Sequence, residues 1–280
     1  MMMAFSRRLL SRCDSEMLRT MCKADSYGIP RIGSVSQVRK ITPKSAYDHY
    51  QKVLRESPVE IFYVGENDPR QIADLLQKLF SRLERSCITL PPQTPLNPAK
   101  PGDYTETMEV AQGKLAMGFV TPVTIRDAEF AAMQVCNAIF GGGMTNLLFM
   151  NIREKLSLCY DIGSSYNSAK GLLTVNAGID CQMVDEAREE IMNQLSLCQN
   201  GRITAEELNA AKQYLRSSAR AVYDSTGAIE YFYGMENLSA RPMTPEKIVE
   251  ELEKVTLNDV LAAARTLRLH TVYFLEGVNR

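Results

Sequence analysis

The feature of the sequence that most constrains the fold is a pattern of helix and strand that occurs twice. In the first occurrence, Thr42 opens a run with helical spacing, and an apolar strand is predicted over residues 59–64. In the second, Thr256 opens a helical run, and residues 271–275 predict a final strand. Each threonine is a predicted N-cap, because its hydroxyl can accept a backbone N–H group that the first turn leaves unpaired.

The two occurrences keep the same register over a longer stretch. Matching positions recur in the same order at an offset of roughly 210 residues, which indicates a duplication; the pairs are Asp14-Ser15 with Asp224-Ser225, Thr42 with Thr256, and Ile61 with Val272. The second copy begins near Tyr104, whereas the first is represented by residues 1 to about 66, so roughly a hundred residues of it are expected to be missing. An incomplete first copy exposes part of a sheet and core, so either a partner chain covers them or the chain is a truncated fragment.

A proline-rich stretch separates the copies. Residues 91–101 contain five prolines and predict an extended linker, because proline fits neither a helix interior nor a central strand. Residues 72–79 before it have helical spacing. The predicted organisation is therefore residues 1–85 as the end of the first copy, 86–103 as the linker and 104–280 as a complete second copy.

The second copy has the element pattern of an α+β domain. Strands over 106–110 and 114–120 flank Ala111-Gln112-Gly113, which predicts a hairpin. Gly141–Gly143 is expected to end a helix over 126–140 by supplying positive φ. The remaining predictions are strands over 159–166 and 172–177, and helices over 145–155, 184–198, 204–224 and 245–252. Helices grouped between few strands indicate an antiparallel or mixed sheet with helices packed on one face.

Composition excludes several classes of protein. The net charge of −1 provides no field that favours nucleic acid or an anionic membrane, and no apolar run reaches the roughly 18–20 residues of a membrane span. Seven cysteines form no Cys-x-x-Cys pair. Their odd number favours reduced, mostly buried thiols in a cytoplasmic protein over a disulfide framework.

The sequence offers no site for a catalytic metal. His49 and His270 are its two histidines, and no His-x-x-Glu-His motif or inverted counterpart occurs. Gly141–Gly143 lacks the Gly-Lys-Ser/Thr of a phosphate-binding loop, and no Gly-x-Ser-x-Gly occurs. We therefore expect no metal, cofactor or nucleophilic triad in this chain, and Cys159 is interpreted as a buried strand thiol.

One pair of residues does suit peptide chemistry. Arg153 lies near the end of a predicted helix, and Tyr160 enters the next strand, so both side chains can point into one cleft. A guanidinium or phenol aimed at a peptide carbonyl stabilises the negative charge that develops there during hydrolysis. The alternative is structural: Arg153 pairs with Glu154 or Asp161 as a solvated charge, and Tyr160 is a core aromatic.

The sequence around this pair resembles the insulinase/pitrilysin (M16) metallopeptidases. The segments that carry the resemblance are Phe140-Gly141-Gly142-Gly143-Met144, Leu147-Leu148-Phe149, Asn151-Ile152-Arg153-Glu154-Lys155 and Leu158-Cys159-Tyr160. Members of that family consist of two related halves of about this size, with the zinc motif in the early part of the first half. Arg153 and Tyr160 match an arginine and a tyrosine of the family's second half, in an Arg-Glu-Lys-Arg-Gly-Leu-Ala-Tyr type sequence. Leu156, Ser157 and Cys159 replace the usual arginine, glycine and alanine.

The resemblance implies a fold and a role. It implies a duplicated LuxS/MPP-like metallohydrolase fold, and a non-catalytic subunit that lacks zinc and pairs with a zinc-carrying subunit or with a second copy of itself. Arg153 and Tyr160 would stabilise the reacting peptide, and Gly142 and Gly143 would contribute to peptide binding. The chain ending resembles bacterial subunits associated with aminopentanol modification of elongation factor P. The alternatives are a structural scaffold without peptidase activity, as in respiratory complexes, and a non-functional fragment.

Overall fold

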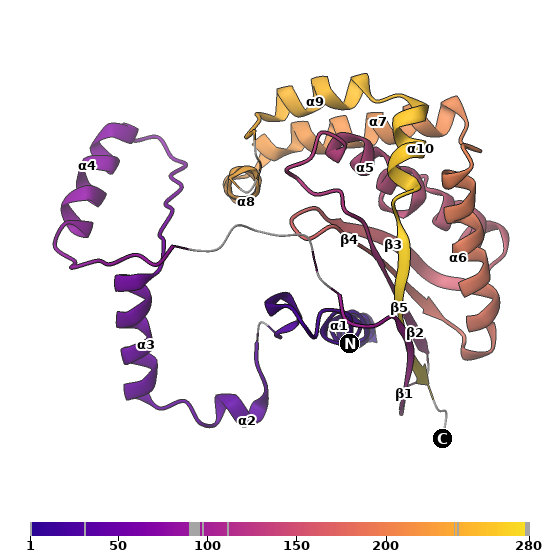
Figure 1. The fold of residues 1–280 in the computed structure, drawn as a ribbon, viewed down its shortest axis with the longest axis horizontal. Helices are drawn as coiled ribbons and strands as arrows, with labels where there is room; N and C mark the ends of the chain where they lie inside the picture. Colours follow the sequence, from indigo (N-terminus) through magenta and orange to yellow (C-terminus); the bar gives the residue numbers. More distant parts are fainter. Residues whose placement is uncertain are drawn as a thin grey trace.

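The computed structural model describes residues 2–30, 32–89, 96, 98–110, 112–237, 239 and 241–277. Among them, five strands form one mixed sheet in the order β1-β5-β2-β4-β3 (Figure 1). β1 runs parallel to β5, and the other neighbours are antiparallel. The strands are β1 (Gly102–Met108), β2 (Gly113–Val120), β3 (Cys159–Asn167), β4 (Leu172–Ile179) and β5 (Arg268–Gly277). The predicted α+β class and mixed sheet are confirmed.

The predicted hairpin between the first two strands is wrong. β1 and β2 do not pair, because β5 lies between them and bonds to both. Ala111, part of the expected turn, lies outside the described residues. The burial of the strands explains the order: Val272 and Leu275 of β5 are buried, whereas most of β1 is exposed. An apolar strand gains more by taking a central position, and the polar strand is left at the edge.

Helices of the second half cover one face of this sheet, as predicted. They pack over a core that includes Leu115, Met117 and Phe119 of β2. Thr204, Thr244 and Thr256 accept backbone N–H bonds as N-caps, which confirms the predicted helix starts at these positions. The helices are α5 (Phe130–Asn137), α6 (Val184–Gln199), α7 (Ala205–Arg220), α8 (Thr226–Glu236), α9 (Pro245–Lys254) and α10 (Leu257–Ala264), and short 3₁₀ turns occupy η4 (Cys181–Met183) and η5 (Ala221–Asp224).

An additional helix from the N-terminal part covers the opposite face of the sheet. This helix is α1 (Met2–Met21), and it lies against β2, β4 and β5 (Figure 1). Cys13, Met17 and Met21 are fully buried there among Ala116 and Leu275. The short turn η1 (Ser26–Gly28) after α1 is tied to the β3–β4 connection by an ion pair of 3.2 Å between Asp25 and Lys170. The sheet is therefore covered on both faces, and its second layer comes from the first part of the chain.

Residues 32–89 form a region with little core of its own. It holds α2 (Val35–Val38), α3 (Pro43–Glu56) and α4 (Pro69–Phe80), none of which buries a residue. Thr42 caps α3 as predicted: its hydroxyl accepts the Ser45 backbone N–H, and the Thr42 backbone N–H donates to the Ser45 hydroxyl. The strand predicted over 59–64 is wrong, because the described residues supply no strand that pairs with this segment. Without a neighbouring strand, its apolar residues are left exposed.

The triple glycine lies at the end of one π-helical segment, and a second follows it. η2 (Ala138–Gly142) continues α5, and η3 (Leu148–Lys155) replaces most of the helix predicted over 145–155. The expectation of positive φ at Gly141–Gly143 is wrong, because the described glycines with positive φ are Gly33, Gly171 and Gly201. Close packing explains the glycines instead: a Cβ on Gly141 would lie 2.6 Å from Ser164 Oγ, and one on Gly143 would lie 2.6 Å from the Ala138 carbonyl oxygen.

Candidate functional site

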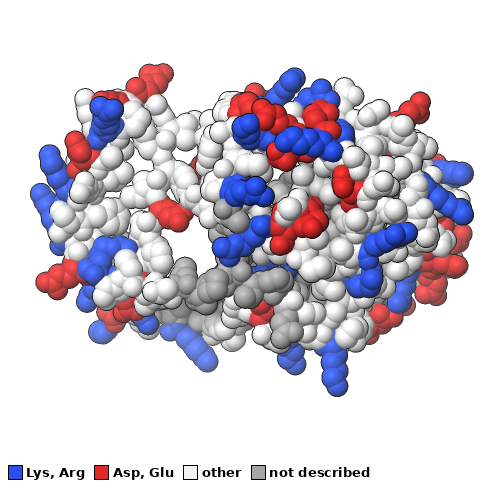
Figure 2. Space-filling model, turned by 45° about the horizontal axis from the view of Figure 1, so that its top comes forward, with Lys and Arg blue, Asp and Glu red and all other residues white. Residues whose placement is uncertain are grey.

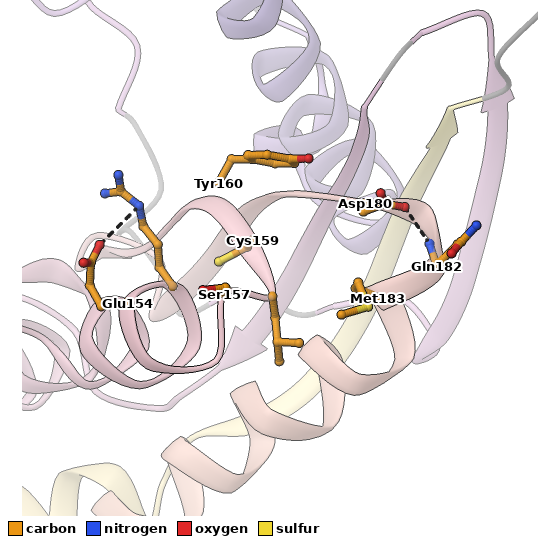
Figure 3. Close-up of a pocket in the computed structure, with 9 residues that line it drawn as sticks. Glu154, Ser157, Cys159, Tyr160, Asp180, Gln182 and Met183 are labelled. Carbon is orange, nitrogen blue, oxygen red and sulfur yellow. Dashed lines mark hydrogen bonds and ion pairs between the residues drawn. The ribbon is translucent and has the colours of Figure 1, made fainter.

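Arg153 and Tyr160 line one open pocket with a volume of about 570 Å³, at the point where η3 gives way to β3 (Figure 3). The structure therefore brings the two predicted site residues together. The lining residues are Arg153, Glu154, Ser157, Leu158, Cys159, Tyr160, Asp180, Gln182 and Met183. They come from the end of η3, the start of β3, and the turn η4 that precedes α6.

Arg153 is held by its neighbours and remains accessible. Its Nε lies 3.6 Å from a Glu154 carboxylate oxygen, and its guanidinium carbon lies 4.7 Å from the centre of the Phe149 ring. The side chain is 42 % exposed. An exposed ion pair and one cation–π contact each contribute about 1 kcal/mol or less, so the guanidinium can turn toward a ligand at small cost.

Tyr160 projects from an irregularity in the sheet. The register between β3 and β4 shifts between Cys159 and Asp161, so Tyr160 is the extra residue of a β-bulge. Its side chain is 62 % exposed, which rules out the core-aromatic interpretation. In Figure 3 the ring extends along the strand, with its hydroxyl on the side of Asp180 and not on that of Glu154. The hydroxyl is therefore available as a hydrogen-bond donor in the pocket.

The connection between the two residues is strained at one position. Ser157 has φ of 54° and is the described non-glycine residue with positive φ. This is a conformation that glycine adopts without steric cost, and glycine is the usual residue here in the sequence that the segment resembles. Leu158 and Cys159, which follow, are buried in the core. Burial raises the pKa of the Cys159 thiol to about 11, so this cysteine is neutral and inert near pH 7.

Gly142 and Gly143 do not reach this pocket. Gly143 lines a separate pocket of about 280 Å³ between η2 and α7. Gly142 faces Asn137, whose side-chain nitrogen would overlap a Cβ at that position. Both glycines are in tight packing positions, and their predicted part in peptide binding has no geometric counterpart beside Arg153 and Tyr160.

The described residues of this chain do not form a zinc site. Within the described residues, no three histidine, cysteine, aspartate or glutamate side chains converge. Both ring nitrogens of His270 are 2.7 Å from hydrogen-bonding partners, the Thr271 hydroxyl and the Ala99 carbonyl oxygen, which makes this histidine structural. His49 lies in the exposed helix α3. The seven cysteines are free thiols, five of them buried, as the sequence predicted.

Sequence reasoning missed the far side of the pocket and the pairing of Lys114 with Asp161 next to Tyr160. Asp180 and Gln182 approach Tyr160 from η4, and the Asp180 side chain accepts the Gln182 backbone N–H. The short aspartate turn before α6 was a readable signal for a local cap. Asp161, named as a possible partner of Arg153, pairs with Lys114 instead, and this approach gave no local signal because it depends on the pairing of β2, β4 and β3.

The comparison with protein families decides the assignment. Residues 40–215, more than half of the chain, match the family model described as the peptidase M16 inactive domain. The chain belongs to the peptidase M16 family. The matched region includes Arg153 and Tyr160, and it lies in the family's inactive part, in keeping with the lack of a zinc motif.

Individual relatives and structures agree with this assignment. The chain is 29 % identical to the probable inactive metalloprotease YmfF of Bacillus subtilis, over 94 % of this chain and 62 % of that protein. It is similar to a conserved protein of Enterococcus faecalis with a TM-score of 0.85 and 28 % identity, covering 97 % of this chain and 64 % of that one. A chain of complex III2 from Candida albicans shares the fold, with a TM-score of 0.74, 13 % identity, and coverage of 95 % of this chain and 66 % of that one. This M16 chain thus spans less than two thirds of the length of these relatives.

Proposed function

We propose that this chain is the zinc-free half of a two-part M16 peptidase, in which Arg153 and Tyr160 hold an extended peptide while a zinc-carrying subunit cleaves it. The observation that carries the proposal is the shared pocket, in which an accessible guanidinium and a projecting phenol lie at the start of a strand at the edge of the sheet. Because the sequence contains no His-x-x-Glu-His motif, the proposal gives the metal to the partner.

The two side chains have complementary roles in this proposal. The Tyr160 hydroxyl and the Arg153 guanidinium donate hydrogen bonds to carbonyl oxygens of the peptide. A donor aimed at the oxygen that becomes negative contributes about 3 kcal/mol to the barrier reduction. β3 pairs with β4 on one side, and an extended peptide beside it would be aligned by main-chain hydrogen bonds.

The exposed region 32–89 supports the need for a covering polypeptide. Many of its large apolar side chains are between about a third and nine tenths exposed, including Ile32, Val35 and Tyr47, and the segment 59–64 within it contains a row of them. A patch of this extent is typical of an interface. Figure 2 shows lysine and arginine interspersed with aspartate and glutamate over one face, so no single charge sign identifies a partner there.

The surroundings expected of such a subunit follow from its thiols and helices. None of the described helices is long and apolar enough to span a bilayer. The free cysteines favour a reducing compartment, so the proposal places the pair in the cytoplasm.

The first experiment is affinity purification of the tagged chain from its source, with mass spectrometry of the proteins that co-elute. A stoichiometric partner that contains His-x-x-Glu-His supports the proposal. Recovery of the chain alone, or with chaperones only, overturns the two-part peptidase.

The reconstituted pair then tests the two residues. Arg153→Ala and Tyr160→Phe should each lower kcat/KM by about a hundredfold, which corresponds to one lost donor, while the pair still assembles. Arg202→Ala, at an exposed position outside the pocket, is the matched control. Full activity of both site variants would contradict their role.

A second candidate function is a scaffold without peptidase activity. The fold likeness to a chain of complex III2 favours it, because that chain belongs to a larger complex. A scaffold predicts a stable complex with no peptide cleavage, and variants of Arg153 and Tyr160 that behave like the unmodified chain. A fragment without function predicts neither a stable partner nor cleavage.

A further inference from the structure

A row of three residues on neighbouring strands, with a charged side chain at each end, lies beside Tyr160. Lys114 of β2 is in register with Gly178 of β4, which is in register with Asp161 of β3. The Lys114 ammonium lies 3.9 Å from an Asp161 carboxylate oxygen, so this pair spans the middle strand. Gly178 makes the approach possible, because a Cβ there would overlap the Asp161 carboxylate and lie 2.6 Å from Lys114 Nζ.

Lys114 is an unusual residue for its position. Its side chain is 1 % exposed, whereas that of Asp161 is 51 % exposed. Nζ also donates a hydrogen bond of 2.6 Å to the Gln112 side-chain oxygen. Burial lowers the pKa of Lys114, and the Asp161 charge opposes that shift. A buried ammonium costs free energy that an apolar side chain of similar size would not, so stability alone does not account for lysine here.

The row anchors one side of the bulge that contains Tyr160. On the other side, Cys159 is 7 % exposed and packs in the core. The two neighbours of Tyr160 are thus held in different ways, one by burial and the other by the Lys114 ammonium. A bulged residue between two fixed neighbours has little freedom to turn, so its side chain is directed into the pocket.

We propose that Lys114 is a positioning residue for Tyr160, acting through Asp161 to fix the bulge that directs the tyrosine hydroxyl into the pocket. The part that concerns peptide cleavage rests on the proposed function. The part that concerns the order of Tyr160 does not, and can be measured on the full chain without a partner.

The first test is an NMR spectrum of the full chain with ring-labelled tyrosine, in which Tyr160→Phe assigns the Tyr160 signal. Lys114→Met should shift or broaden that signal, because it removes the ammonium and keeps the apolar stem. Lys170→Met is the matched control, since it breaks the partly buried pair with Asp25 at the far end of β3 and β4. An unchanged Tyr160 signal in Lys114→Met would overturn the proposal.

A second variant keeps the test decisive if Lys114→Met fails to fold. Asp161→Asn keeps the size of the half-exposed side chain and removes the charge that Lys114 holds. It should change the Tyr160 signal in the same way. A folded Asp161→Asn chain with an unchanged Tyr160 signal would count against the proposal as firmly as the lysine variant.

The reconstituted pair supplies a double-mutant cycle. Lys114→Met should lower kcat by about tenfold with little change in KM, because misplacement of a catalytic group acts mainly on the transition state. The double variant Lys114→Met/Tyr160→Phe should be no slower than Tyr160→Phe alone. Losses that multiply would show that Lys114 does not act through Tyr160. If no partner or cleavage is found, the proposed function fails while the NMR result still decides the positioning role.

Discussion

At the scale of single residues, two residues near the pocket cost conformational or solvation free energy at their positions. Ser157 adopts a left-handed backbone conformation that L-residues avoid, and Lys114 places a charge in the interior. Ser157 lies in the connection between Arg153 and Tyr160, and Lys114 pairs with Asp161, the residue after Tyr160. Strain and buried charge that persist beside a pocket are typical of sites shaped by function and not by stability alone.

Ser157→Gly should stabilise the chain. Glycine reaches φ of 54° without the steric cost that serine meets, which is about 1 kcal/mol. Ser217→Gly in α7 is the matched control, and it should destabilise by about 0.5 kcal/mol because glycine is a poorer helix former than serine. Urea denaturation gives both free energies of unfolding. A loss of stability in Ser157→Gly would show that the strain is not relieved by glycine.

The stability that Lys114 contributes should depend on pH with a defined sign. The folded pKa lies below the ordinary lysine value of about 10.4, so between these two values the unfolded chain binds more protons. The free energy of unfolding of the unmodified chain should therefore rise with pH relative to that of Lys114→Met, by at most about 1.4 kcal/mol per pH unit.

Urea denaturation at several pH values measures this difference in the free energy of unfolding. The pH range from about 7 to 10 covers the window below the ordinary lysine pKa. Lys170→Met gives the background difference for another lysine. If the difference between the unmodified chain and Lys114→Met stays flat across this range, folding does not lower the Lys114 pKa.

At the scale of elements, local signals were predictable and non-local pairing was not. Thr42, Thr204 and Thr256 cap their helices as predicted, because a cap depends on residues within one turn. The position of β5 between β1 and β2 depends on competition among strands far apart in the sequence. For the same reason, the sequence indicated that Arg153 and Tyr160 share a cleft, but gave no sign of Lys114 behind them.

The two threonine caps of the repeat should differ in their effect on stability. Thr256→Ala removes the cap of α10, which packs into the core through Val260 and Ala264, and should cost about 1 kcal/mol. Thr42→Ala removes the same type of cap from α3, which buries no residue. Its effect on the main unfolding transition should be small. Equal losses in thermal denaturation would show that α3 unfolds together with the sheet.

At the scale of the whole molecule, the sheet depends on a helix that precedes the linker. Met17 and Met21 of α1 are fully buried against the second half, and a Cβ on Gly118 would lie 2.6 Å from Met21 Sδ. The predicted division into two copies therefore does not coincide with separate cores. Residues assigned by sequence to the first copy complete the packing of the second.

Met21→Ala should destabilise the sheet by about 2–5 kcal/mol, because it opens a cavity between α1 and β2. Leu75→Ala in α4 is the comparison, and it should change the main transition little since Leu75 is 55 % exposed. Hydrogen exchange at β2 and β4 reports the effect directly. A Met21→Ala chain with undiminished protection there would show that α1 is not required by the sheet.

The position of α1 has a consequence for how the chain is made. The Cys13 thiol contacts the Tyr273 carbonyl oxygen across 260 residues of sequence, at 3.5 Å. On a ribosome that adds about 5–20 residues per second, the helix emerges on the order of ten seconds or more before its docking strand β5 exists. During that interval only β2 and β4 of its native docking surface become available, so the apolar face of α1 stays incompletely covered until β5 forms and would benefit from protection by a chaperone.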